Sequence, residues 1–132
     1  MSQIGYGYQK TLSGVSFDDA LSKVAEELKK EGFGVLTEID VKNTLKQKLD
    51  VDFRRYKILG ACNPNLAHQA LDGEAHIGLL LPCNVVVQET DKGDVVVSIA
   101  DPKSMFALVN NEDIAHVAED VATSLRRVLD AL

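Results

Sequence analysis

The two cysteines of this 132-residue chain carry its most reactive side chains, and they lie in two similar short segments. Ala61-Cys62-Asn63-Pro64 and Pro82-Cys83-Asn84 each place an asparagine directly after the cysteine and a proline within two residues of it. A cysteine thiolate is both a nucleophile and a soft metal ligand. An asparagine amide can donate hydrogen bonds to a ligand, as an oxyanion hole requires. The predicted ligand-binding residues are therefore Cys62, Asn63, Cys83 and Asn84.

A metal site would use Cys62 and Cys83, with His68 as the third predicted ligand. This set lacks a fourth ligand for structural zinc, whereas two thiolates alone would hold Cu(I). The separation of the cysteines, 21 residues, matches no zinc-finger or redox spacing. In the alternative of a thiol enzyme, His68 is the nearest histidine that could serve as base. A third alternative is structural, because free cysteine is often buried as a small hydrophobic residue. No catalytic set is complete, so we assign no catalytic residue and leave the question of an enzyme open.

The charge is unevenly distributed along the chain. Residues 1–60 carry ten Lys/Arg and nine Asp/Glu, a net charge of +1, whereas residues 61–132 carry four and eleven, a net charge of −7. The total of −6 argues against general nucleic-acid binding. The basic segment 42–57 could nevertheless attract an acidic partner, or it could be a solvated helix face. Its bases are Lys42, Lys46, Lys48, Arg54, Arg55 and Lys57.

The composition is that of one average globular domain. The hydrophobic fraction is 45% and the charged fraction 26%, so we predict a single domain spanning residues 1–132. MSQIGYGYQK contains no basic stretch followed by an apolar one, and no apolar run is long enough to span a bilayer. We therefore expect a cytoplasmic protein that does not bind membranes, with reduced cysteines.

The positions of these residues depend on an alternation of strands and helices. Two long helices are predicted, one over residues 17–31 with Ser16 as N-cap and Gly32 as stop, and one that begins near Asn111. A short helix is predicted after Asp40 and another over Asn65–Ala70. The predicted strands are residues 4–12, Phe33–Ile39, Tyr56–Ala61, Ile77–Val87 with a bend at Pro82, and Val95–Ala100.

Strands 77–87 and 95–100 are apolar on both faces. The two long helices can cover one face of the sheet, so the other face needs cover of its own. A second copy of the chain in a C2 dimer would supply that cover. Alternatively, the face lines a ligand pocket, or the two short helices fold under it.

Three segments carry a resemblance to a known family: YKILGACNP at 56–64, IGLLLPCNVVV at 77–87, and EIDVKNTLKQKLDVDFRRY upstream of them. With these segments the chain resembles the domain-of-unknown-function 302 family over nearly its whole length. The resemblance implies an α+β fold like that of the TATA-binding protein, β-α-β(4)-α. Such a fold has a curved, mainly antiparallel sheet with two long helices packed on one face, and the resemblance further implies a homodimer. It carries over no settled biochemical activity and leaves any cofactor unknown, and fold likeness alone does not imply DNA binding.

Three hypotheses of function follow. The first is a homodimeric module that binds a small molecule or a soft metal near Cys62 and Cys83. The second is a structural or interaction protein that uses the basic segment 42–57. The third is a thiol-dependent enzyme, which ranks last because no acid-base set is complete. The expected partners are a second copy of the chain and a small molecule, with neither nucleic acid nor membrane.

Overall fold

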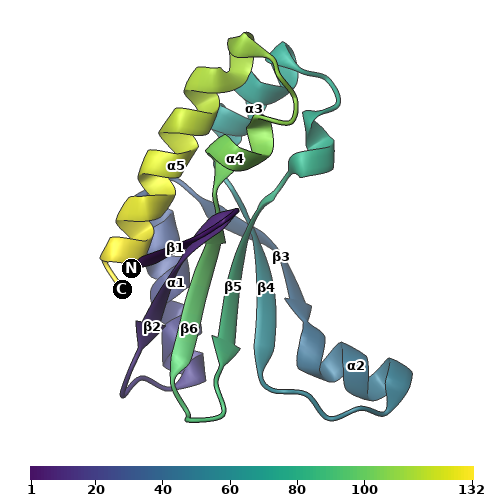
Figure 1. The fold of residues 1–132 in the computed structure, drawn as a ribbon, viewed down its shortest axis with the longest axis vertical. Coiled ribbons are helices and arrows are strands. Elements are labelled where there is room, and N and C mark those ends of the chain that lie inside the picture. The colour runs from purple at the N-terminus through teal and green to yellow at the C-terminus, as the bar shows by residue number, and fades with distance from the viewer.

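The computed structural model describes residues 1–132 as an antiparallel sheet of six strands with helices on one side and at both ends (Figure 1). The strand order is β1-β2-β6-β5-β4-β3. The strands are β1 (Ser2–Ile4), β2 (Gly7–Leu12), β3 (Gly34–Asp40), β4 (Tyr56–Cys62), β5 (Cys83–Glu89) and β6 (Val95–Ala100). The helices are α1 (Phe17–Lys30), α2 (Val41–Leu49), α3 (Pro64–Gly73), α4 (Pro102–Phe106) and α5 (Ala115–Asp130), with 3-10 turns η1 (Ile77–Leu80) and η2 (Glu112–Ile114). None of these helices has the length and apolar character needed to cross a membrane.

Local signals set the ends of α1 as predicted. The Ser16 hydroxyl accepts a hydrogen bond from the backbone N–H of Asp19 at 3.1 Å, which satisfies a donor that the helix leaves free. Gly32 follows the helix with a φ of 82°, a conformation that favours glycine. Phe17, Ala20, Val24 and Leu28 form the buried stripe of the helix, so its amphipathic pattern is the surface that packs on the sheet.

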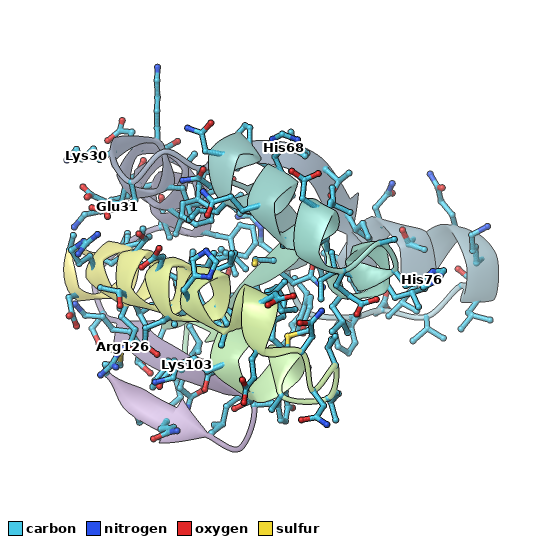
Figure 2. The ribbon with its side chains drawn as sticks, turned by 90° about the horizontal axis from the view of Figure 1, so that it is seen from above. Lys30, Glu31, His68, His76, Lys103 and Arg126 are labelled. Carbon is cyan, nitrogen blue, oxygen red and sulfur yellow. The ribbon has the colours of Figure 1, made fainter.

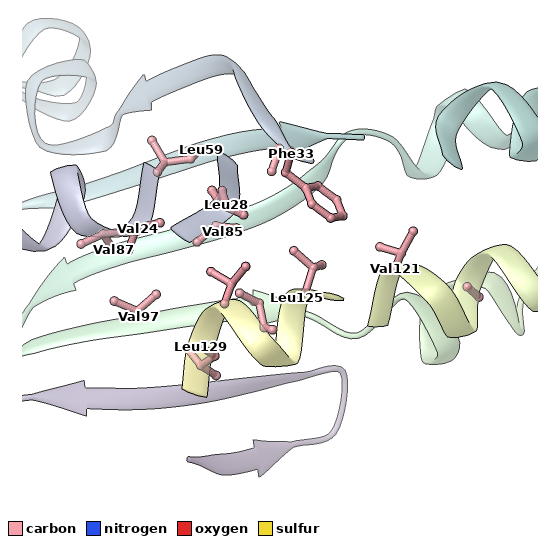
Figure 3. Close-up of a cluster of buried hydrophobic side chains, with 14 of the residues drawn as sticks. Val24, Leu28, Phe33, Leu59, Val85, Val87, Val97, Val121, Leu125 and Leu129 are labelled. Atoms are coloured by element: carbon pink, nitrogen blue, oxygen red, sulfur yellow. The ribbon is translucent and has the colours of Figure 1, made fainter. Parts of the chain in front are cut away.

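The core lies between the sheet and the two long helices, α1 and α5 (Figure 3). Leu28 from α1 and Leu125 from α5 are fully buried there, against Val85, Val87 and Val97 from the sheet. Both helices therefore cover the same face, and the predicted α+β fold is confirmed.

The opposite face of the sheet, which we call the open face, has no helix across it (Figure 1). In β6 the exposure alternates strictly, with Val95, Val97 and Ile99 buried and Val96, Ser98 and Ala100 half-buried. Strand register places Ile39, Ile58, Val86 and Ser98 in one row across this face. The row is apolar over three strands, so the doubly apolar pattern of the sequence corresponds to one covered and one uncovered face.

The short helices do not fold under the open face. Helix α2 extends from the end of β3, away from the body of the protein, and contains no buried residue (Figure 1). Helices α3 and α4 lie beyond the other end of the sheet, against α5 (Figure 1). The expectation that short helices cover this face is therefore wrong.

Two predicted strands differ in detail from the structure, and one helix was missed. The strand predicted over residues 4–12 is a hairpin, in which Gly5 and Tyr6 connect β1 to β2. The strand predicted over residues 77–87 begins only at Cys83, since residues 77–80 form the 3-10 turn η1. Pro82 cannot donate a ladder hydrogen bond, which accounts for a strand that begins after it. Helix α4 was not predicted, although Asp101 caps it and Pro102 occupies its first turn.

Candidate functional site

Both cysteines lie at the same end of two paired strands. Cys62 is the last residue of β4 and Cys83 the first of β5. In the antiparallel register Ala61 lies opposite Cys83, so Cys62 is one residue from direct pairing with it. The topology thus brings together two segments that are 21 residues apart in the sequence.

Cys62 and Cys83 line one small apolar cavity. Its volume is about 20 Å³, room for about one water molecule. Eleven of its 13 lining residues are hydrophobic. The walls include Phe33, Leu66, Leu81, Phe106, Val117 and Val121. Figure 3 shows Phe33, next to the sheet, and Val121, on α5, at this end of the core. The cavity therefore lies where the sheet, α3 and α5 meet.

Burial, and to a lesser extent the nearby Cys62, raises the pKa of the Cys83 thiol to about 11. A nucleophilic cysteine instead has a lowered pKa, which a neighbouring cation or base provides. At neutral pH the Cys83 side chain is a neutral thiol. The direction of this shift disfavours Cys83 as the nucleophile of a thiol enzyme.

The two asparagines of the cysteine segments have different surroundings. Asn63 lines the cavity, but its Oδ1 accepts a hydrogen bond from the backbone N–H of Leu66 at 3.3 Å, which makes it the N-cap of α3. Asn84 is an exposed residue of β5, is paired with Gly60 and is not part of the cavity wall. Of the four predicted ligand-binding residues, Cys62, Asn63 and Cys83 come together and Asn84 does not.

The histidines lie away from the cavity. His68 is exposed on α3, with its Nε2 3.4 Å from Oδ2 of Asp72, and His76 is exposed before η1 (Figure 2). His116 is exposed on α5 and contacts Gln69. No three His, Cys, Asp or Glu side chains come together to hold a metal ion anywhere in the chain. The predicted ligand set of Cys62, Cys83 and His68 is therefore reduced to the two cysteines.

Most cations of the basic segment 42–57 have partners within the chain. Lys46 pairs with Asp50 at 2.9 Å, Arg55 with Asp18 at 2.7 Å, and Lys57 with Glu38 at 2.6 Å. Lys42 donates to the carbonyl of Phe53. These contacts neutralise much of the positive charge of the segment. A solvated helix face therefore explains the basic residues better than a binding surface for acidic partners does.

The molecule also has larger hollows that are not at the cysteines. An open depression of about 370 Å³ lies between α4 and α5, lined among others by Lys103 and Glu119, whose side chains form an ion pair at 3.0 Å. No cysteine or histidine lines it. For chemistry we therefore favour the smaller thiol cavity over this larger one.

The sequence did not point to the cavity walls. Phe106 lies on the unpredicted helix α4, and Val117 and Val121 have the spacing of an ordinary core stripe. Such a stripe carries no signal that separates a cavity wall from a filled core. Only their place in the same cavity wall as the two cysteines identifies them as part of the site.

Comparisons with known proteins give the family. A search of proteins with curated descriptions finds no significant match. The chain is similar to the crystal structure of an uncharacterized conserved DUF302 protein from Bacillus stearothermophilus, with 29% sequence identity and a TM-score of 0.88. The match covers 96% of this chain and 98% of that one. The model of the family described as domain of unknown function DUF302 matches residues 8–132. Because this match spans nearly the whole chain, the protein belongs to the DUF302 family.

Proposed function

We propose that this protein is a homodimeric binding module that holds one soft metal ion between Cys62 and Cys83. The observation that carries this proposal is that both cysteines belong to the wall of the same small, mostly apolar cavity. Thiolates prefer soft metal ions to hard ones. The pairing of β4 with β5 keeps the two cysteine residues close together at one end of the sheet.

The size of the cavity favours an ion over an organic ligand. Sites for drug-sized molecules measure about 300–1,000 Å³. The thiol cavity, at about 20 Å³, has room for roughly one water molecule. The sequence suggested either a small molecule or a soft metal ion as the ligand. A small molecule would need the cavity walls to move apart, whereas a single ion would not.

The dimer is supported by surface that the single chain leaves uncovered. The nine residues of α2 include no buried one, and helices this short are marginal in water on their own. Exposed apolar side chains continue from β3 into α2 and the following loop: Leu36, Ile39, Leu49 and Val51. A second copy, related by a two-fold axis, would bury these residues and the apolar row of the open face.

Metal binding is tested on the purified, reduced protein with Cd²⁺, Zn²⁺ and Cu(I) in turn. We expect native mass spectrometry to show one ion per chain and maleimide labelling of both cysteines to fall in the loaded protein. Cys62→Ser and Cys83→Ser should lose the ion, while His68→Ala, a matched control outside the cavity, should keep it. If no ion binds, or if ions bind equally well to both cysteine variants, the proposal is wrong.

The dimer is tested by sedimentation equilibrium. We expect twice the chain mass for the wild type and for Ser22→Lys, a control on the exposed side of α1. Ile58→Lys and Ile39→Lys, both on the open face, should yield folded monomers because a lysine ammonium is costly to bury in an apolar interface. A monomeric wild type, or dimers that persist in both lysine variants, would contradict this part of the proposal.

A further inference from the structure

The depression between α4 and α5 has the size and the lining of a site for a small ligand. Its volume of about 370 Å³ lies at the lower end of the range for such sites, about 300–1,000 Å³. Half of its ten lining residues are hydrophobic and the other half are charged or amide side chains, so it can hold a ligand with one apolar and one polar end. We propose that it binds an α-amino acid with an apolar side chain. The carboxylate of the ligand pairs with Lys103, and its ammonium pairs with Glu119.

The two charges of such a ligand would meet two protein charges that already lie side by side. Lys103 Nζ is 3.0 Å from Glu119 Oε2, where the start of α4 approaches α5 (Figure 2). The hydrogen bond to Glu119 raises the pKa of Lys103, so the lysine is charged at neutral pH. The two side chains are 53% and 60% exposed, and an ion pair so exposed contributes little to stability. A ligand with opposite charges on one carbon atom can therefore take up both partners at little cost.

The net charge of the wall favours a zwitterion over a simple anion. The wall has two carboxylates, Glu112 and Glu119, against the single ammonium of Lys103. A ligand with only a carboxylate would approach a wall of net negative charge, which repels it. A ligand with only an ammonium would engage Glu119 and leave Lys103 without its partner. An α-amino acid satisfies Lys103 and Glu119 together.

The floor of the depression fits an apolar side chain. Phe106, Ile114 and Ala118 are buried residues that contribute to the lining. Ala107 and Ala115 also line it and are themselves exposed, and their short side chains leave the space open. An apolar side chain placed on this floor would lose contact with water, which favours binding in proportion to the area covered.

The proposal is tested by isothermal titration calorimetry with three ligands that share one apolar body. These are leucine, 4-methylpentanoate, which lacks the ammonium, and 3-methylbutylamine, which lacks the carboxylate. We expect one leucine to bind per chain and each of the other two to bind about tenfold more weakly or worse, because each lacks one charged contact. Valine and phenylalanine are titrated alongside leucine to cover the class of side chain.

Two charge variants assign the contacts of the head group. Lys103→Gln should abolish the preference for leucine over 3-methylbutylamine, and Glu119→Gln should abolish the preference for leucine over 4-methylpentanoate. Lys30→Gln is the matched control, since it breaks an exposed ion pair with Glu27 at 2.8 Å on α1. This control should bind leucine as the wild type does.

A third variant fills the depression. Ala115→Leu should abolish leucine binding, whereas Ala25→Leu, at an exposed position of α1, should not. If none of the three amino acids binds, or if the three leucine-like ligands bind the wild type equally well, the proposal is wrong. Leucine binding that persists in Ala115→Leu would place the ligand elsewhere and also overturn it. The titrations contain no metal, and Cys62→Ser and Cys83→Ser should bind leucine normally, so a failure here leaves the soft-metal proposal standing. The ligand series uses wild-type protein, so it remains decisive where a variant does not fold.

Discussion

The two faces of the sheet carry similar side chains but have different surroundings. On the face covered by α1 and α5, Val85 and Val87 are fully buried. On the open face, Val86 lies between them in the same strand and is only half-buried. Apolar content is therefore no guide to the packing of a strand face in this protein. What differs is the presence of a helix on one side, and the thiol of Cys83 shares the covered side with Val85 and Val87.

The largest effect that would test this comparison comes from a matched pair of leucines. Leu125 on α5 is fully buried, whereas Leu49 on α2 is 66% exposed. Leu125→Ala should lower the free energy of unfolding by about 3–5 kcal/mol, because it leaves a cavity in a packed core. Leu49→Ala should change the stability of the monomer by less than about 0.5 kcal/mol. Urea denaturation measures both, and comparable losses would show that the core extends to α2.

A second effect concerns the covered thiol and depends on pH. The pKa of Cys83 is about 11 in the folded protein against 9.0 for the free side chain. Between these values the unfolded chain loses the proton and the folded chain keeps it, so stability falls as the pH rises from 9 to 11. The loss attributable to Cys83 reaches about 3 kcal/mol at most.

Denaturation at pH 8, 9, 10 and 11 measures this loss in wild type and in Cys83→Ala. Lys30 and Lys103 have raised pKa values and titrate at high pH in both proteins, so the difference between the two isolates the thiol. An equal slope in the two proteins would place Cys83 in contact with water instead of among apolar side chains.

The two faces of β5 are compared directly by neighbouring valines. Val87→Ala, on the covered face, should cost about 2–3 kcal/mol through lost burial and the cavity it leaves. Val86→Ala, on the open face, should cost less than about 1 kcal/mol in the monomer. If the open face is a dimer interface, the Val86→Ala loss should grow with protein concentration, because association stabilises the folded chain. Denaturation at two protein concentrations distinguishes these cases.

The smallest expected effect compares the caps of a packed and an unpacked helix. The Ser16 hydroxyl caps α1, and the Asp40 carboxylate accepts from the backbone N–H of Asn43 at 2.9 Å to cap α2. Ser16→Ala should lower global stability by about 1 kcal/mol. Asp40→Ala should instead unfold α2 locally, seen as faster amide exchange there with little change in global stability. A large global loss from Asp40→Ala would mean that α2 is an integral part of the folded unit.

Several elements were predictable because their signals are local. Ser16 and Gly32 marked the ends of α1, and Asp40 marked the start of α2. The first turn and apolar stripe of the last helix were also recognisable, although η2 precedes α5 and shifts its start to Ala115. Residues 77–80 were mistaken for strand because a short apolar run has no periodicity that separates a strand from a helical turn.

The candidate site was predictable only in part. Cys62, Cys83 and Asn63 were identified from residue type and do surround one cavity. His68 was included for its closeness in sequence to Cys62, yet the turn into α3 points it to solvent. Asn84 was included because it follows Cys83 in the sequence. Successive residues of a strand point to opposite faces of the sheet, so Asn84 points away from the covered face on which Cys83 lies.

The amino-acid sequence by itself determined the helix and strand segments, the apolar character of both sheet faces and the two thiols, since these follow from residue types and local spacing. The tertiary structure alone decided which face the helices cover, that the two cysteines help to line one cavity, and how small that cavity is. These depend on strand register and on packing between segments far apart in the chain. The two cysteine segments are chemically alike in sequence, and only the pairing of β4 with β5 makes them one site.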